Sequence, residues 1–431
     1  MPLKHTVEEI VIGNGIKGLI IDVPDSTVVS YDINFRAGYD YADPSIQQVA
    51  HLLEHLSFGA NDNYSTAEEF SQEFSKNGAT ISATTSNRSM SYSSLSALME
   101  LGRIMDLFKL AITHPQYKQK LFDAERGNVR EELVAQANNH SRVLFQQIQR
   151  AMGDTCLIDS EKIETINKVE LSDIQNFYTK THTLNNMRFV IAGNISESKE
   201  MIIDKLNNWD LTVGERFPVK QVSVKSSPIV HLYRPDLSNL TFEITILLPR
   251  QLSTTELVAM GGLNHILTGT FHSRIFGKAR SQGICYHVSS NYDTDVSNVS
   301  SWEIYGRVGL ENAESLFKLI IEQLQKVIDN DITNEELDSA KQYALGRYQM
   351  RGQTVGSVVG WYAEDYFNRE VIEMMDLSPE SIKSTTLQDM VVLAKEFIEK
   401  GEWTLGGIGN ISQEQLQSYY DLLLNLLKKV K

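Results

Sequence analysis

Two histidines and a glutamate fall within five residues of this chain, in the stretch His51-Leu-Leu-Glu54-His55. Residues four apart share one face of a helix, so His51 and His55 present two imidazoles to one point in space. Glu54 lies beside them, which suits a base placed next to a metal but not on it. The order His-x-x-Glu-His is the inverted form of the commoner zinc-protease signature. The stretch is therefore a candidate metal site, and the alternative is an ordinary helix that carries charge by chance.

A catalytic zinc ion needs a third protein ligand, because such sites typically combine three protein side chains with a water. Glu125 and Glu132 lie downstream in a stretch of helical spacing, seven residues or two helical turns apart, so they share a face. Both can therefore point toward one partner. Glu132 is a candidate third ligand, and the alternative is that both glutamates are merely solvated.

Three short phrases recur in the same order, at offsets of 216, 211 and 210 residues. They are Gly193-Asn-Ile-Ser196 with Gly409-Asn-Ile-Ser412, Tyr31-Asp-Ile-Asn-Phe35 with Phe242-Glu-Ile-Thr-Ile246, and Leu53-Glu54-His55 with Leu263-Asn264-His265. The shared order predicts a tandem duplication, with a period too long for a solenoid. Breaks in periodicity near Pro218 and Pro228 place a linker between the halves. We expect a metal-binding domain at 1–212, a linker at 213–228 and a second homologous domain at 229–431.

The duplication supplies an internal control for the metal site. At an offset of 210 residues, the second half has Gly261, Asn264 and His265 in place of the motif. Gly261 has no side chain to bind a metal, and Asn264 cannot act as a base. The same offset takes Glu132 to Gln342, within a few residues. A polar set that the fold required would persist in both halves, so its presence in one half favours a functional site.

Hydrophobic periodicity indicates the elements that must position these residues. Two stretches alternate as strands do, 28–35 and 79–84, and four have helical spacing, 46–58, 67–75, 98–112 and 117–152. Strands followed by paired long helices, repeated once, predict an α+β fold. We expect each of the two domains to be a mostly antiparallel sheet packed against helices.

Composition narrows the class of protein. With 431 residues and 42% apolar side chains, the chain can build more than one core. A net charge of −15 with both signs interspersed argues against nucleic-acid binding. The two cysteines cannot form a disulfide framework or an all-cysteine zinc site. We expect a cytoplasmic protein without a membrane segment, because no signal-like run begins the chain and no stretch approaches about 18 apolar residues.

With these motifs in hand, the chain resembles the pitrilysin and insulinase family of zinc metallopeptidases. It looks like the short branch of that family, which includes the mitochondrial processing peptidase and many bacterial relatives. The resemblance covers nearly the whole chain. Besides the motif, it is carried by Phe35-Arg-Ala-Gly38, Tyr64-Ser-Thr-Ala-Glu-Glu-Phe70, Asn77-Gly-Ala-Thr-Ile-Ser-Ala83 and Leu171-Ser-Asp-Ile-Gln-Asn-Phe-Tyr178.

The resemblance implies that zinc is bound by three side chains, those of His51, His55 and Glu132. It implies that Glu54 is the general base and that Glu125 supports catalysis from just outside the ligands. Glu131 competes for the ligand role because it adjoins Glu132, but the seven-residue spacing from Glu125 favours Glu132.

In the second half, the resemblance points to Arg280 and Tyr286 as residues that contact the substrate carbonyl. The segment between Phe276 and Gly283 is one residue shorter than the family pattern, so Lys278 is an alternative to Arg280. The stretch 78–86 resembles the family's edge strand, which receives the substrate as an added strand. The substrate-binding positions expected there are Ala79, Ser82, Ala83 and Thr84, with Ser82-Ala83 where the family commonly has Asn-Ala.

The function implied by the resemblance is that of a zinc-dependent endopeptidase. Its substrates would be unfolded peptides or flexible protein segments, cut inside the chamber of a dimer. A homodimer is the simplest assembly, because one chain carries both the metal motif and the Tyr286 segment, and a heterodimer with a metal-free relative is the alternative. Two other readings stay open, a non-catalytic relative acting as a peptide-binding or structural subunit, and a binding module with structural zinc.

Overall fold

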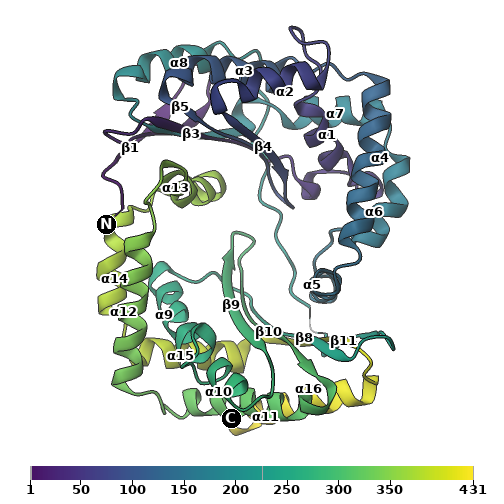
Figure 1. Ribbon diagram of the computed structural model, residues 1–431, viewed down its shortest axis with the longest axis vertical. Helices are drawn as coiled ribbons and strands as arrows, with labels where there is room; N and C mark the ends of the chain where they lie inside the picture. The colour runs from purple at the N-terminus through teal and green to yellow at the C-terminus, as the bar shows by residue number, and fades with distance from the viewer. Residues whose placement is uncertain (1, 226, 431) are drawn as a thin grey trace. The chain divides into compact units, whose positions relative to one another are not determined.

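The computed structural model describes residues 2–225 and 227–430, which form two sheets covered by helices (Figure 1). The chain divides into two compact units. Unit 1 comprises the residues up to Gln136, Cys156–Lys220 and Gln349–Met375. Unit 2 comprises Ala137–Thr155, Gln221–Tyr348 and the residues from Asp376 onward. The predicted α+β class, with two sheets, is confirmed.

Unit 1 contains six strands in the order β1-β2-β6-β3-β5-β4. The strands are β1 (Thr6–Val11), β2 (Lys17–Asp22), β3 (Val28–Phe35), β4 (Thr80–Thr85), β5 (Met90–Ala97) and β6 (Met187–Gly193). All neighbours are antiparallel except β2 and β6, which run parallel. The helices are α1 (Val49–Ser57), α2 (Ala67–Ser75), α3 (Leu101–Thr113), α4 (Gln119–Gln136), α6 (Asp159–Thr165), α7 (Leu171–Thr181), α8 (Lys199–Asn207) and α13 (Val355–Arg369).

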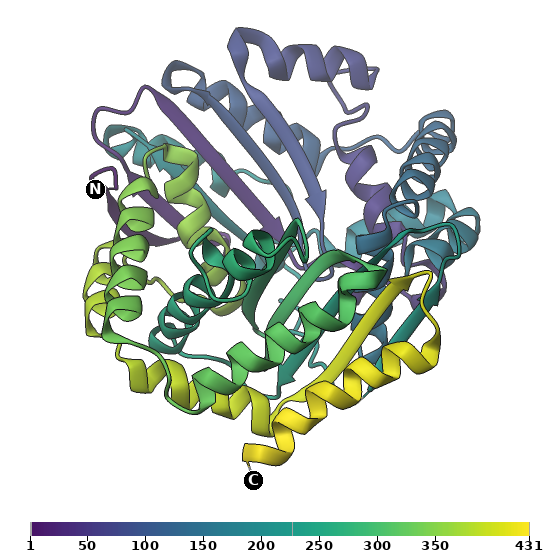
Figure 2. The same ribbon diagram turned by 60° about the horizontal axis from the view of Figure 1, so that its bottom comes forward.

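Unit 2 contains five strands in the order β7-β11-β8-β10-β9. The strands are β7 (Ile229–Tyr233), β8 (Asn239–Leu248), β9 (His287–Asp295), β10 (Val299–Gly309) and β11 (Glu402–Gly409). The helices are α5 (His140–Ala151), α9 (Thr254–Asn264), α10 (Phe276–Ser281), α11 (Ala313–Ile328), α12 (Asn334–Met350), α14 (Ser378–Ser384), α15 (Leu387–Lys400) and α16 (Gln413–Val430). Figure 2 shows α16 running beside β11, both in yellow.

The two sheets repeat one topology. The order β2-β6-β3-β5-β4 in unit 1 matches β7-β11-β8-β10-β9 in unit 2, and in both the first pair is parallel and the rest antiparallel. The strands that carry the echoed phrases at Tyr31 and Phe242 are the equivalent strands β3 and β8. This agreement supports a tandem duplication. The predicted domain limits, 1–212 and 229–431 with a linker at 213–228, divide the chain by sequence and stay a prediction.

One helix of each half belongs to the compact unit of the other half. Helix α13 packs on β6 and β3 of unit 1, and its counterpart α5 packs on β11 and β8 of unit 2. Each supplies an apolar stripe, such as Val358, Tyr362 and Tyr366 in α13 and Leu144 and Ile148 in α5. The two sequence halves and the two compact units therefore differ, because each half contributes one helix, α5 or α13, to the unit of the other half.

The predicted helical stretch 117–152 is two helices and not one. Helix α4 ends at Gln136, and α5 begins at His140 after Asn139, whose side chain accepts a hydrogen bond from the backbone N–H of Arg142. Asparagine favours such N-caps because its side chain replaces the missing helical partner. The break separates the helix of the candidate ligand Glu132 from a helix that belongs to unit 2.

The core of unit 1 lies between the sheet and its helices. Strand β3 alternates, with Tyr31, Ile33 and Phe35 in the core and Asp32 and Asn34 on the opposite face. Figure 1 shows α3 and α8 over one face of this sheet and α13 over the other. No helix among the described residues has the length and hydrophobicity needed to cross a bilayer.

Candidate metal centre

Helix α1 carries the His-x-x-Glu-His motif on a face that its apolar residues determine. Val49, Leu53 and Leu56 are buried in the unit 1 core, so the face with both imidazoles turns toward α4. The rings of His51 and His55 lie edge to face, with centroids 4.9 Å apart. The helical spacing thus brings two metal-binding rings together.

Helix α4 brings Glu132 to the same point. Its Oε2 lies 3.6 Å from Nε2 of His51 and 3.7 Å from Nε2 of His55. The three potential ligand atoms all lie within 4.8 Å of one another. Glu131 is instead 78% exposed at its side chain, and its carboxylate pairs with Arg130 at 3.5 Å. Of the two adjacent glutamates, Glu132 is the one that converges with the histidines.

The remaining ring nitrogens have partners that leave both Nε2 atoms for a metal. Nδ1 of His55 lies 3.0 Å from Oε2 of Glu125, and because a carboxylate only accepts, that nitrogen donates. Nδ1 of His51 lies 3.3 Å from the amide oxygen of Gln48. Such outer partners fix the tautomer and the orientation of metal-binding histidines. Two imidazole nitrogens and one carboxylate, so oriented, fit zinc.

Glu54 lies beside the three convergent side chains without being one of them. Its Oε2 accepts a hydrogen bond of 3.0 Å from Oγ1 of Thr85 at the end of β4. Burial raises the pKa of Glu54 above its ordinary value, the Thr85 hydrogen bond and nearby His55 lower it, and the charge of Glu132 raises it again. The net rise makes this carboxylate a better proton acceptor than an exposed glutamate.

The predicted substrate strand lies at an edge of the unit 1 sheet. Strand β4 is last in the strand order and lies beside α1. Ser82 and Thr84 point to the exposed side, and Ala83 is half-buried against the core. Ala79 precedes the strand and is buried. The strand positions that the resemblance assigns to substrate binding therefore lie on an edge strand, and Ala79 lies at its start.

In unit 2, Arg280 and Tyr286 form a pair. Nη1 of Arg280 donates a 2.9 Å hydrogen bond to the carbonyl oxygen of Tyr286, and the guanidinium lies 4.4 Å from the centre of the tyrosine ring. Tyr286 is 80% exposed. Lys278 lines a different pocket, with Gln323 and Asp331. The geometry thus favours Arg280 over Lys278 for the role beside Tyr286.

Three further side chains support the centre, and sequence reasoning did not identify them. Gln48 contacts His51 from three residues earlier on the chain, and Gln136 donates to Oε1 of Glu132 from four residues later. Helical spacing predicts both contacts once the ligands are known. Thr85 reaches Glu54 from another element, and no pattern in the sequence indicates it.

The equivalent place in unit 2 lacks the ligands. Gln342, the position expected for Glu132 at an offset of 210, lies on α12. The ring of His265, which corresponds to His55, stacks on Tyr343 with centroids 4.2 Å apart. Tyr343, next to Gln342, thus lies against His265 as Glu132 lies against His55 in unit 1, so the fold does not need the polar set.

Fold and site together define a class of duplicated α+β proteins built like zinc peptidases. Residues 19–157 match "Insulinase (Peptidase family M16)", and residues 168–343 match "Peptidase M16 inactive domain". The chain belongs to this insulinase family of peptidases, as the resemblance predicted.

Individual relatives are distant in sequence and close in fold. An uncharacterized zinc protease, YmxG of Bacillus subtilis, is 21% identical over 351 residues, which cover 80% of this chain and 84% of the relative. A "non-peptidase homolog" of Helicobacter pylori is 26% identical over 202 residues, 45% of each chain. The crystal structure of a protease from Helicobacter pylori superposes with a TM-score of 0.81 at 19% identity, over 95% of this chain and all of that one.

Proposed function

We propose that this protein is a zinc-dependent endopeptidase that cleaves unfolded peptides or flexible protein segments. The observation that carries the proposal is the convergence of His51, His55 and Glu132 beside a half-buried Glu54. The family and the relatives named zinc proteases support it. Lewis-acid activation of a water molecule is the chemistry that zinc supplies when it is bound.

The side chains of the site have separate roles in this proposal. Glu54 removes a proton from the attacking water and later delivers it to the departing amine. The hydrogen bond from Thr85 holds the Glu54 carboxylate in place for both transfers. Arg280 and Tyr286 donate hydrogen bonds to the peptide carbonyl as negative charge develops on its oxygen. The exposed edge of β4 aligns the peptide through backbone hydrogen bonds.

A non-catalytic role as a peptide-binding or structural subunit is the second candidate. One relative is named a non-peptidase homolog, so the family includes chains without activity. The presence of Glu54 beside the convergent His51, His55 and Glu132 favours catalysis. We also propose that the chain forms a homodimer in the cytoplasm. A heterodimer with a metal-free relative is the alternative assembly.

The test compares the wild type with Glu54→Gln after both are loaded with zinc. We expect Glu54→Gln to keep one zinc per chain, measured by mass spectrometry of the metal, because Glu54 is not among the three ligands. Its turnover of a diverse pool of unstructured peptides should fall by about 100-fold or more. Equal turnover in the two proteins would remove Glu54 as the base. Zinc without turnover in the wild type would favour the second candidate.

Glu132→Gln separates metal binding from proton transfer. A neutral amide is a poorer zinc ligand than a carboxylate, so this variant should lose zinc affinity by about tenfold or more. Glu131→Gln is its matched control, because that neighbouring carboxylate points to Arg130. Loss of zinc from both variants, or from neither, would contradict the ligand assignment.

A further inference from the structure

Unit 2 contains an open pocket of about 870 Å³ on the face of its sheet that lies away from the core helices. Strands β8 and β10 form its floor, and the segment from Arg280 to the start of β9 forms one side. The residues important here are Thr241, Glu243, Arg280, Tyr286, Tyr305 and Arg307. This pocket includes the Arg280–Tyr286 pair and extends well beyond it.

Glu243 is the buried charge of this pocket. It is 8% exposed and lies on β8 between Phe242 and Ile244, which point into the core on the other face. One of its oxygens accepts a 2.9 Å hydrogen bond from Oγ1 of Thr245. Among the described residues no ion pair joins Glu243 to a cation. A carboxylate buried without a counter-charge costs free energy that a hydrogen-bonding or charged ligand recovers.

A second acidic residue makes a positive charge near Glu243 more favourable. Glu303 lies on the same face, opposite Thr245 on β10, one diagonal step from Glu243. Burial first, and the charge of Glu303 second, raise the pKa of Glu243 to about 7. A neighbouring lysine or arginine would have the opposite effect. The pKa therefore agrees with the geometry that no cation of this chain neutralises the carboxylate.

The two arginines of the pocket are already engaged elsewhere. The Arg280 guanidinium donates to the Tyr286 carbonyl and lies over the rings of Phe271 and Tyr286. Nε of Arg307 donates to Oγ1 of Thr241 at 3.3 Å, and its side chain is exposed at the rim. The floor at Glu243 therefore remains open to a charge from outside the chain.

We propose that this pocket is a subsite for a lysine or arginine side chain of a bound peptide, with Glu243 as the counter-charge. This inference rests on the proposed function, since it assumes that the protein binds peptides. Tyr305 lies directly opposite Glu243 in the strand register and is 41% exposed. Its ring, with that of Tyr286, offers an apolar and cation-attracting wall for the stem of a basic side chain.

The experiment measures binding and not cleavage, so that a failure of the proposed function does not hide the result. The full chain carrying Glu54→Gln is titrated with fluorescent unstructured peptides that differ at one position, which is lysine, norleucine or glutamate. Norleucine keeps the aliphatic stem of lysine and lacks its charge. We expect the lysine peptide to bind about tenfold or more tightly than the norleucine peptide, and the glutamate peptide to bind most weakly.

Adding Glu243→Gln, which keeps the shape of the side chain, should reduce the preference for lysine over norleucine to about twofold or less. Asp32→Asn is the matched control. Asp32 is the counterpart of Glu243 on β3 of unit 1, and burial likewise raises its pKa, to about 6. The Asp32→Asn variant tests whether removing a different buried carboxylate from a central strand also changes the lysine preference. The lysine preference should survive in Asp32→Asn.

The proposal would be overturned by any of three results. These are equal affinities for the three peptides, no measurable binding of any of them, and a lysine preference that survives Glu243→Gln. If Glu243→Gln does not fold, a lysine analogue carrying a photoreactive diazirine replaces the variant. In the Glu54→Gln chain it should label peptides that contain Tyr286 or Tyr305. Labelling confined to other parts of the chain would overturn the subsite. Lysine-selective binding without any cleavage by the wild type would instead contradict the proposed function alone.

Discussion

Two glutamates of one centre differ in environment in a way that suits different roles. Glu132 is 42% exposed at its side chain and converges with both imidazoles. Glu54 is more buried, its pKa is raised, and a hydroxyl rather than a histidine holds it. An ionised carboxylate is the better metal ligand, and a carboxylate of raised pKa is the better base near neutral pH. The residue type alone does not distinguish these roles, but the surroundings do.

The Thr85→Val variant tests how much the proposed activity depends on the positioning of the Glu54 carboxylate. Valine keeps the shape of threonine and removes the only hydroxyl that is hydrogen-bonded to Glu54 in the described residues. Because a hydrogen bond to a charged group is worth about 1.5–3 kcal/mol, kcat should fall by about 10-fold or more. Zinc content should not change. Thr80→Val, on the same strand, is the control, and an equal loss in both variants would show that the strand and not the hydroxyl matters.

At the scale of elements, Arg36 explains part of the Phe35-Arg-Ala-Gly38 phrase. Its guanidinium donates to the carbonyl oxygen of Asn368 at 3.0 Å and to that of Phe217. Asn368 belongs to the last turn of α13, where helical carbonyls lack partners and a cation is favourable. The segment Phe35-Arg-Ala-Gly38, one of those that carry the family resemblance, therefore holds α13 in place through Arg36. Gly38 is required for a different reason, because a Cβ there would lie 2.4 Å from the carbonyl oxygen of Ser86.

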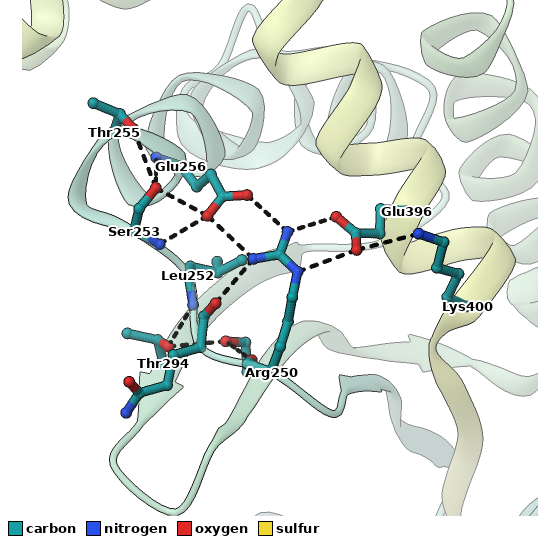
Figure 3. A network of polar contacts seen from close by, with 10 residues as sticks. Arg250, Leu252, Ser253, Thr255, Glu256, Thr294, Glu396 and Lys400 are labelled. Carbon is teal, nitrogen blue, oxygen red and sulfur yellow. Dashed lines mark hydrogen bonds and ion pairs between the residues drawn. The ribbon is translucent and has the colours of Figure 1, made fainter.

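Arg250, in the loop between β8 and α9, joins α9 to α15 in unit 2 (Figure 3). Its guanidinium pairs with Glu256 of α9 at 2.7 Å and with Glu396 of α15 at 2.5 Å. Hydrogen bonds from Arg250 lower the pKa of both carboxyls. Arg250→Met should therefore reduce the free energy of unfolding by about 2 kcal/mol at pH 7, measured by urea denaturation. Lys400→Met is the control, since that exposed lysine also pairs with Glu396, and its effect should stay below about 0.5 kcal/mol.

The stabilisation by Arg250 depends on pH in a defined direction. A carboxyl whose pKa is lowered by folding stabilises the folded state above its unfolded pKa, near 4.5, and loses that contribution as the pH falls through the folded pKa. The difference in stability between wild type and Arg250→Met should thus shrink below pH 4.5. A difference that stays constant down to pH 3 would show that the arginine acts through packing and not charge.

His182 gives unit 1 the same direction of pH dependence through burial. Its ring is buried under α1, where Nε2 contacts the hydroxyl of Tyr92, which in turn contacts Ser57. Burial lowers the pKa of His182 to about 3. The unfolded chain binds a proton near pH 6.5 that the folded chain does not bind, so stability is complete above pH 6.5 and falls below it.

The expected slope of this loss is about 1.4 kcal/mol per pH unit between pH 6.5 and pH 3. His182→Phe keeps the ring stacked on Phe35 and removes the titrating group. In urea denaturation at pH 7.5 and pH 5.5, the wild type should lose more stability than the variant by about that slope. Parallel losses would mean that His182 is protonated in the folded protein.

At the scale of the whole molecule, duplication and divergence separate the roles of the two units. Unit 1 keeps the convergent ligands, and unit 2 has the ring of Tyr343 against His265, the counterpart of His55. Unit 2 has instead the pocket with Glu243 and the Arg280–Tyr286 pair. The same sheet topology thus carries a candidate metal centre in unit 1 and a candidate peptide subsite in unit 2.

The proposed homodimer predicts complementation between two inactive variants. If each active site takes Glu54 from one copy and Tyr286 from the other, a heterodimer of Glu54→Gln and Tyr286→Phe chains has one intact site. Such a heterodimer, purified through two different tags, should recover about half of the wild-type activity. Each variant alone should stay inactive. A monomeric mass in solution, or no recovery in the heterodimer, would contradict the composite site.

The sequence by itself indicated the residue types of the candidate centre and the repeat of the fold. His51 and His55 are four residues apart on one helix, and such local spacing does not depend on the rest of the chain. The echoes at Tyr31 and Phe242 likewise fall on equivalent strands, because alternation along a strand is a local property. The α+β class followed from these patterns and is confirmed.

Only the tertiary structure decided which distant residues meet. It brought Thr85 to Glu54, split the stretch 117–152 into helices of different units, and left Glu243 without an ion pair to a cation among the described residues. Each of these outcomes depends on how one element faces another. The packing of many side chains determines that arrangement, and periodicity along the chain does not reveal it. Spacing tells which face of an element a residue occupies, whereas the fold tells what that face meets.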